Sequence, residues 1–190
     1  MEIKQAAWPD ILRIYREKMP QHFPANELKP EAFMRRMYED GCYEGFLCRE
    51  PEGEAGYAFF FCLPGEPAVL LDFLALEEAF RGRKIGSRFL DELRAGAYAG
   101  RDILLEIDDP DKAPDEEKRT LWLRRQEFYR RLGAVDTGLR SCIWEAPYRI
   151  LCLPAVKGQR PGREETREKL SRFYREMYGE EVYQRDIVIE

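Results

Sequence analysis

The segment with the clearest chemical potential is a basic turn, Arg81-Gly82-Arg83-Lys84-Ile85-Gly86-Ser87, which lies between an apolar run and an amphipathic run. The first N–H groups of a helix have no partner inside the helix, and the helix dipole adds positive potential there. A pyrophosphate at this turn would be stabilised by those donors and by the three basic side chains. The two glycines would let backbone and ligand approach closely. The competing interpretation is a solvated basic turn that merely begins a helix; the GxGxxG spacing of a dinucleotide fold is absent.

Two carboxylates are isolated within apolar runs. Asp72 is the only charge in residues 68–76, and Glu106 is the only charge in residues 103–107. Burying a charge without a partner is energetically costly, so we expect each of these acids to have either a partner or a functional role. Each is a candidate proton acceptor or substrate anchor, and a structural ion pair, for example with an arginine of residues 124–134, is the alternative. Strand periodicity places Asp72 on the same face as Leu74 and Leu76.

Other candidate residues give weaker signals. Glu27 lies between two expected helices and could bind a cationic substrate, although a solvated loop acid is the simpler interpretation. His22 is the only histidine, and we expect it at the surface or as a local cap. The five cysteines show no CxxC spacing, which favours small buried thiols over zinc ligands or disulfides. No spacing of histidines, cysteines and carboxylates indicates a metal site.

Hydrophobic periodicity predicts the elements that must position these groups. We expect strands at 2–6, 42–49, 55–63, 68–76, 103–107, 134–137, 141–144 and 148–153, and helices at 8–19, after Pro30, at 84–98, at 115–132 and at 170–178. Pro20 and Pro24 are expected to stop the first helix. This order predicts an α+β or mixed α/β fold. We expect a single domain over 1–190, with residues 154–190 as a C-terminal loop and helix extension.

Composition narrows the class of protein. The net charge is -5, with 44% hydrophobic and 35% charged residues, which is typical of a globular domain. A nucleic-acid-binding protein is disfavoured because the chain as a whole lacks the excess of basic residues that such domains carry. The amino terminus lacks the pattern of a signal peptide, and no apolar run approaches the ~20 residues of a membrane span. We therefore expect a cytoplasmic protein without a membrane partner.

The basic turn resembles motif A of the GNAT N-acetyltransferase superfamily, Gln/Arg-x-x-Gly-x-Gly/Ala, with Arg81, Ile85 and Gly86 in register. Lys84 stands where the family usually has its first glycine, which retains the backbone N–H but makes the approach of a ligand less close. Residues 124–134 resemble the family's motif B, a helix that ends in Phe-Tyr-x-x-x-Gly before a strand. The two motifs and the elements between them cover about residues 68 to 137.

This resemblance implies a fold and a reaction. The fold is a mostly antiparallel sheet that is splayed between the strands at 68–76 and 103–107 and has helices on both faces. The cosubstrate would be acetyl-CoA, without a metal, and the backbone at Leu74, Ala75 and Leu76 would bind its pantetheine arm and polarise the thioester, at ~3 kcal/mol per donor. A primary amine would attack directly in a ternary complex. Tyr129 would protonate the departing thiolate; packing beneath the sheet is its alternative role.

A CoA-binding sensor or partner subunit without transfer activity is the alternative function. The acceptor would be a small-molecule amine or a protein amine. Acidic groups near the expected site hint at a cationic acceptor: Glu27, Asp72, Glu106, Asp108 and Asp109. We expect a monomer or a homodimer.

Overall fold

The computed structural model describes residues 1–190, which form two compact units. The first unit comprises Met1–Pro64 and Leu71–Leu90, and the second comprises Gly65–Leu70 and Asp91–Glu190. Each unit combines strands and helices. The fold is mixed α+β with mostly antiparallel strand pairs, as the sequence predicts.

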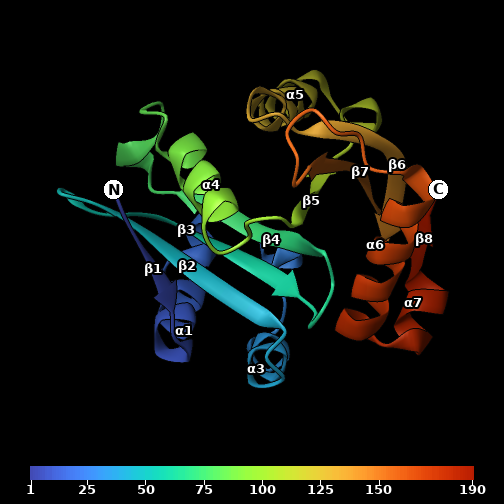
Figure 1. The fold of residues 1–190 in the computed structure, drawn as a ribbon, viewed down its shortest axis with the longest axis horizontal. Helices are drawn as coiled ribbons and strands as arrows, with labels where there is room; N and C mark the ends of the chain where they lie inside the picture. The colour runs from blue at the N-terminus through green and yellow to red at the C-terminus, as the bar shows by residue number, and fades with distance from the viewer. The chain divides into compact units, whose positions relative to one another are not determined.

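The first unit is built on the neighbouring strands β1, β2, β3 and β4. Its elements are β1 (Glu2–Ala6), α1 (Trp8–Glu17), α2 (Met19–His22), the short 3-10 helix η1 (Ala25–Glu27), α3 (Glu31–Glu39), β2 (Tyr43–Glu50), β3 (Gly53–Cys62), most of β4 (Ala68–Leu76), the 3-10 helix η2 (Glu78–Phe80) and the first half of α4 (Ile85–Ala95). β2 pairs antiparallel with both β1 and β3. Helices α1 and α3 lie on one side of these strands and α4 lies on the other (Figure 1).

Strand β4 has the face pattern that the sequence predicts. Asp72, Leu74 and Leu76 are half-buried, whereas the residues between them are buried. Gly56 on β3 lets the two strands approach closely, because a Cβ there would lie 2.4 Å from the carbonyl oxygen of Ala75. The close approach of β4 to β3 therefore depends on the absence of a side chain at position 56.

The second unit is built on the strand order β5, β7, β6, β8. Its elements are β5 (Asp102–Asp108), the 3-10 helix η3 (Pro110–Lys112), α5 (Glu116–Arg131), β6 (Val135–Ile143), β7 (Ala146–Leu153), α6 (Arg163–Tyr178), α7 (Glu180–Asp186) and β8 (Ile187–Ile189). β7 pairs antiparallel with β5 and β6. Helices α5 and α6 lie on opposite sides of these strands (Figure 1).

Three local predictions need correction, and two elements were missed. Pro20 lies in the first turn of α2 rather than ending a helix, and a proline is tolerated there because its missing N–H would have no partner. Helix α4 ends at Ala95, before Gly96, instead of reaching residue 98. The two strands expected at 134–137 and 141–144 are one strand, β6, because Gly138, with a φ of 78°, lies in an irregularity of the register and not in a turn. Helix α7 and strand β8 were not predicted.

Candidate functional site

The basic turn connects β4, through η2, to the start of α4. Arg88 N–H donates to the carbonyl of Lys84 at 3.1 Å, which closes the first turn of the helix. The N–H groups of Ile85, Gly86 and Ser87 donate to no main-chain carbonyl in hydrogen-bonding geometry. The structure thus provides the unpaired donors that an anion at this helix terminus would require.

The turn needs left-handed backbone at two positions. Gly82 has a φ of 76° and Lys84 has a φ of 59°. Glycine adopts this region freely, whereas a side chain there costs roughly 1–2 kcal/mol. Lys84 is the residue that departs from motif A, and its conformation gives a physical reason for the glycine that the motif usually has.

The basic side chains around the turn differ in their partners. Arg81 Nε donates to the carbonyl of Leu76 at 3.1 Å, which ties the turn to the end of β4. Arg83 donates to Glu52 at 2.7 Å, on the connection between β2 and β3. No ion pair or side-chain hydrogen bond holds Lys84, which is exposed. Its ammonium group is therefore available to an anionic ligand.

Asp72 lies within a polar network of the first unit. Lys29 Nζ lies 2.5 Å from Asp72 Oδ1, and the Tyr43 hydroxyl donates to Oδ2 at 2.6 Å. Lys29 also lies 5.1 Å from the centre of the Phe73 ring. Both oxygens of Asp72 are thus engaged, and its cationic partner is a lysine before α3 rather than an arginine of motif B.

Glu106 lies in the second unit, in the middle of β5. The hydroxyl of Tyr174, on α6, contacts its Oε1. The glutamate is half-buried, whereas Tyr174 is fully buried. Tyr174 therefore engages Glu106 from α6, a helix in which the sequence indicated no site residue.

Tyr129 is also in the second unit, at the C-terminal end of α5. Its ring packs edge-on against Phe128, with ring centres 5.0 Å apart, and the residue is 8% exposed. Burial raises the pKa of Tyr129 to about 12, and the nearby Arg125 opposes this only in part. The phenol therefore keeps its proton at neutral pH, as a proton donor must.

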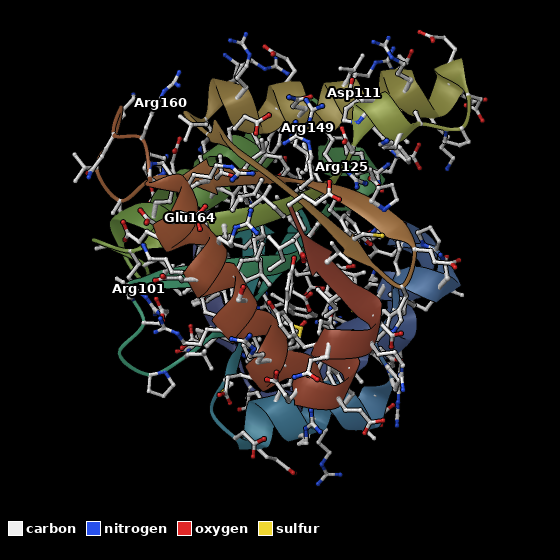
Figure 2. The ribbon with its side chains drawn as sticks, turned by 90° about the vertical axis from the view of Figure 1, so that its right-hand side faces the viewer. Arg101, Asp111, Arg125, Arg149, Arg160 and Glu164 are labelled. Carbon is white, nitrogen blue, oxygen red and sulfur yellow. The ribbon has the colours of Figure 1, made fainter.

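The acidic loop that follows β5 is held by arginines. Arg125 donates to Asp108 at 2.7 Å, and Arg149 lies 2.8 Å from Asp109 and 2.5 Å from Asp111. Figure 2 shows Arg125 on α5, with Asp111 and Arg149 beside that helix. These internal pairs offset the charges of Asp108 and Asp109, which weakens the indication of a cationic acceptor.

The two remaining candidates, Glu27 and His22, differ in their exposure to solvent. Glu27 is exposed in η1. His22 is neither at the surface nor a cap, which corrects the prediction: its side chain is only 7% exposed, and its Nδ1 lies 3.0 Å from the Tyr57 hydroxyl. Burial lowers the pKa of His22. The His22 side chain is buried because α2 packs against β3.

Sequence reasoning did not identify Lys29, Tyr43 or Tyr174 as members of the site. Tyr43 begins a strand and Tyr174 lies in an amphipathic stripe, so both resemble ordinary core residues. Lys29 is 43 positions from Asp72, and Tyr174 is 68 positions from Glu106. No local pattern links such pairs.

No group of three or more histidine, cysteine, aspartate or glutamate side chains is arranged to hold a metal ion. None of the helices combines the length and the apolar character that crossing a membrane would require.

No protein-family model matches the sequence, and a comparison with curated proteins finds no match. Solved structures do match. A protein from Bacteroides thetaiotaomicron ascribed to the GNAT acetyltransferase family has a TM-score of 0.72 at 17% identity, covering 94% of this chain and 99% of that one. The aminoglycoside 6'-N-acetyltransferase from Enterococcus faecium has a TM-score of 0.59 at 17% identity, with 85% and 99% covered. The ribosomal-protein-S18-alanine N-acetyltransferase from Escherichia coli has a TM-score of 0.57 at 14% identity, with 83% and 96% covered.

Proposed function

We propose that this chain, which has the fold of the GNAT acetyltransferases, transfers an acetyl group from acetyl-CoA to a primary amine by direct attack in a ternary complex. The fold alone does not carry this function, because one fold can host unrelated activities. The observation that carries it is the turn before α4. Its helix donors are unpaired, and the position where motif A has a glycine, Lys84, adopts the left-handed backbone that favours glycine.

The cofactor-binding residues we propose are those of the turn and of the strand before it. The N–H groups that open α4 would bind the pyrophosphate of acetyl-CoA, and Lys84 would add charge to that contact. The main chain at Leu74, Ala75 and Leu76 would hold the pantetheine arm and polarise the thioester carbonyl. Gly56 supports this assignment because the absence of a side chain there lets the main chain at Ala75 lie close to β3.

Tyr129 would be the acid of the reaction. As the amine nitrogen bonds to the thioester carbon, the carbon–sulfur bond breaks and its electron pair remains on sulfur. The buried phenol would give its proton to that sulfur. A hydroxyl that stays protonated at neutral pH and has no side-chain hydrogen-bond partner suits this role.

Glu106 would accept the proton that the ammonium form of the substrate must lose before it can attack. An alkylamine has a pKa near ~10, so it reaches the site charged. Asp72 is less suited to this step because Lys29 and Tyr43 already engage both of its oxygens. We assign to Asp72 the anchoring of the segment before α3, where Glu27 would line the acceptor site.

The test has two stages. Calorimetric titration should show that acetyl-CoA binds with one-to-one stoichiometry. An amine panel, comprising an aminoglycoside, a polyamine and a peptide with an amino-terminal alanine, is then monitored for release of free thiol. Thiol release with any of these amines supports transfer. Binding without release from a broad panel favours a CoA-binding sensor or partner subunit, and failure of acetyl-CoA to bind rejects both.

A further inference from the structure

Three polar side chains from three elements of the second unit meet beneath α6. They are Glu106 on β5, Ser141 on β6 and Tyr174 on α6. The Tyr174 hydroxyl contacts Glu106 Oε1 and lies 3.2 Å from Ser141 Oγ. Tyr174 is 0% exposed and Ser141 is 4% exposed, so water does not substitute for these contacts.

The hydrogens in this cluster can be assigned from simple chemistry. A phenol has one proton to donate, and an ionised carboxylate has none. Tyr174 therefore donates to Glu106, and the Ser141 hydroxyl donates to the oxygen of Tyr174. Burial, followed by the nearby charge of Glu106, raises the pKa of Tyr174 well above its ordinary value, so the phenol remains a donor at neutral pH. Each bond in such a chain polarises the next and strengthens it.

We propose that Tyr174 is a positioning residue for Glu106, which makes helix α6 part of the machinery for proton transfer. This inference rests on the proposed function, because it assumes that Glu106 accepts a proton from the amine. Fixing one oxygen of Glu106 restricts the rotation of a flexible side chain, so the carboxylate is presented in one orientation. A general base is effective only when it is held within hydrogen-bonding reach of the proton that it takes.

A simple packing role does not account for the hydroxyl. Neighbouring residues of α6, such as Phe173 and Met177, are fully buried without one. A phenylalanine at 174 would fill the same space, and a tyrosine there adds the cost of a buried hydroxyl unless that hydroxyl is bonded. The bond it makes is to the one acid inside the apolar run of β5.

The principal test is Tyr174→Phe, with Tyr183→Phe as the matched control. Tyr183 also bonds a serine of α6, Ser171, at 3.1 Å, and the structure gives it no carboxylate partner. Two readouts are measured: the pH dependence of kcat/KM for thiol release, and the titration of the Glu106 carboxyl by carbon-13 NMR. Calorimetry with acetyl-CoA accompanies both.

In Tyr174→Phe, the Glu106 carboxylate loses a donor, so its titration and the acid limb of the rate profile should both move upward by about one pH unit. We expect kcat to fall about tenfold, which is part of the ~100-fold or more that a general base contributes, because Glu106 is retained but held less well; acetyl-CoA affinity should be unchanged. Tyr183→Phe should alter neither readout. Ser141→Ala, which removes only the outer donor of the chain, should give a smaller shift in the same direction, and it replaces the test if Tyr174→Phe does not fold.

The inference is overturned if the wild-type protein is active but Tyr174→Phe shows the same acid limb and the same Glu106 titration as wild type. Ser141→Ala takes the place of Tyr174→Phe in this comparison if the latter does not fold. Either result leaves the proposed function intact. A shifted Glu106 titration without a shifted acid limb shows that the contact is structural and also overturns it. A wild-type protein that binds acetyl-CoA but acetylates no amine overturns the proposed function, and the positioning role falls with it.

Discussion

Lys29 Nζ lies 2.5 Å from Asp72 Oδ1, and this pair joins the segment before α3 to the middle of β4. The two side chains are 13% and 3% exposed, so neither charge is well solvated. The Tyr43 hydroxyl completes the coordination of the carboxylate. A charge isolated in an apolar strand is thus neutralised by a residue that is distant in sequence, and the same pair holds the segment before α3 against β4.

Breaking this pair from one side should destabilise the protein strongly. Lys29→Met leaves Asp72 charged and buried, and we expect a loss of about 3 kcal/mol in the free energy of unfolding. The double variant Lys29→Met/Asp72→Asn should recover part of that loss, because it leaves no unpaired charge. Urea unfolding measures both. Arg35→Met, which removes an exposed pair with Glu39, is the control and should cost about 0.5 kcal/mol or less; an equal loss in both single variants would refute this account.

Replacing Lys84 should separate backbone strain from charge. Lys84→Gly relieves the left-handed strain but adds freedom to the unfolded chain, so we expect a net gain of about 0.5–1 kcal/mol in stability. Lys84→Ala keeps the strain and should leave stability unchanged. Both variants remove the ammonium group, so the affinity for acetyl-CoA should depend less on salt concentration in each. Thermal unfolding measures the stability, and calorimetry at two salt concentrations measures the affinity. A Lys84→Gly variant that is less stable than Lys84→Ala would contradict the claim that the backbone at Lys84 is strained.

Gly56→Ala should disturb β4 directly. The added methyl group would lie 2.4 Å from the carbonyl oxygen of Ala75, so β3 and β4 must separate. We expect a loss of about 1–3 kcal/mol in stability, as for other overpacked positions, together with weaker binding of acetyl-CoA. Gly162→Ala is the matched control, because its nearest neighbour lies at 3.7 Å. Equal stability of the two variants would show that the strands adjust to the methyl group at position 56 without loss of stability.

Tyr129→Phe should reduce turnover at least tenfold, because general-acid catalysis typically contributes ~100-fold or more, while the affinity for acetyl-CoA changes little. The pKa of about 12 places deprotonation of this phenol far above neutrality. The wild-type rate should therefore show no loss from this group as pH rises to about 10, two units below that pKa. Stopped-flow thiol release and a rate–pH profile test both points. Unchanged turnover would remove Tyr129 from the mechanism without affecting the binding site.

His22 should make stability dependent on pH. Burial lowers the pKa of His22 in the folded state, whereas the unfolded chain titrates near its ordinary value of ~6.5. The unfolded state then binds more protons, so stability should fall as pH drops through about 6.5 and level off below the folded pKa. Because His22 is the only histidine, His22→Gln should flatten this part of the curve. Denaturant unfolding between pH 5 and 8 provides the measurement. If the unfolding free energy of His22→Gln changes with pH as steeply as that of the wild type, other groups cause the pH dependence.

The local features of this protein could be predicted from sequence. The turn at 81–87 is contiguous, so its basic residues, its glycines and the helix that follows are visible in one short segment. The alternation of Asp72, Leu74 and Leu76 in β4 follows from strand periodicity. The positive φ of Lys84 was not predicted, although its place in the motif indicated an unusual position.

The partners of the isolated charges were decided by tertiary structure alone. Asp72 and Glu106 could each be recognised as needing a partner, because burial of an unpaired charge is costly. Which residue supplies that partner depends on how helices and strands pack, and Lys29, Tyr43 and Tyr174 reach these acids across separations that carry no periodic signal. Strand β8 and the continuous β6 have the same origin: pairing between distant segments stabilised what the local pattern of residues left open.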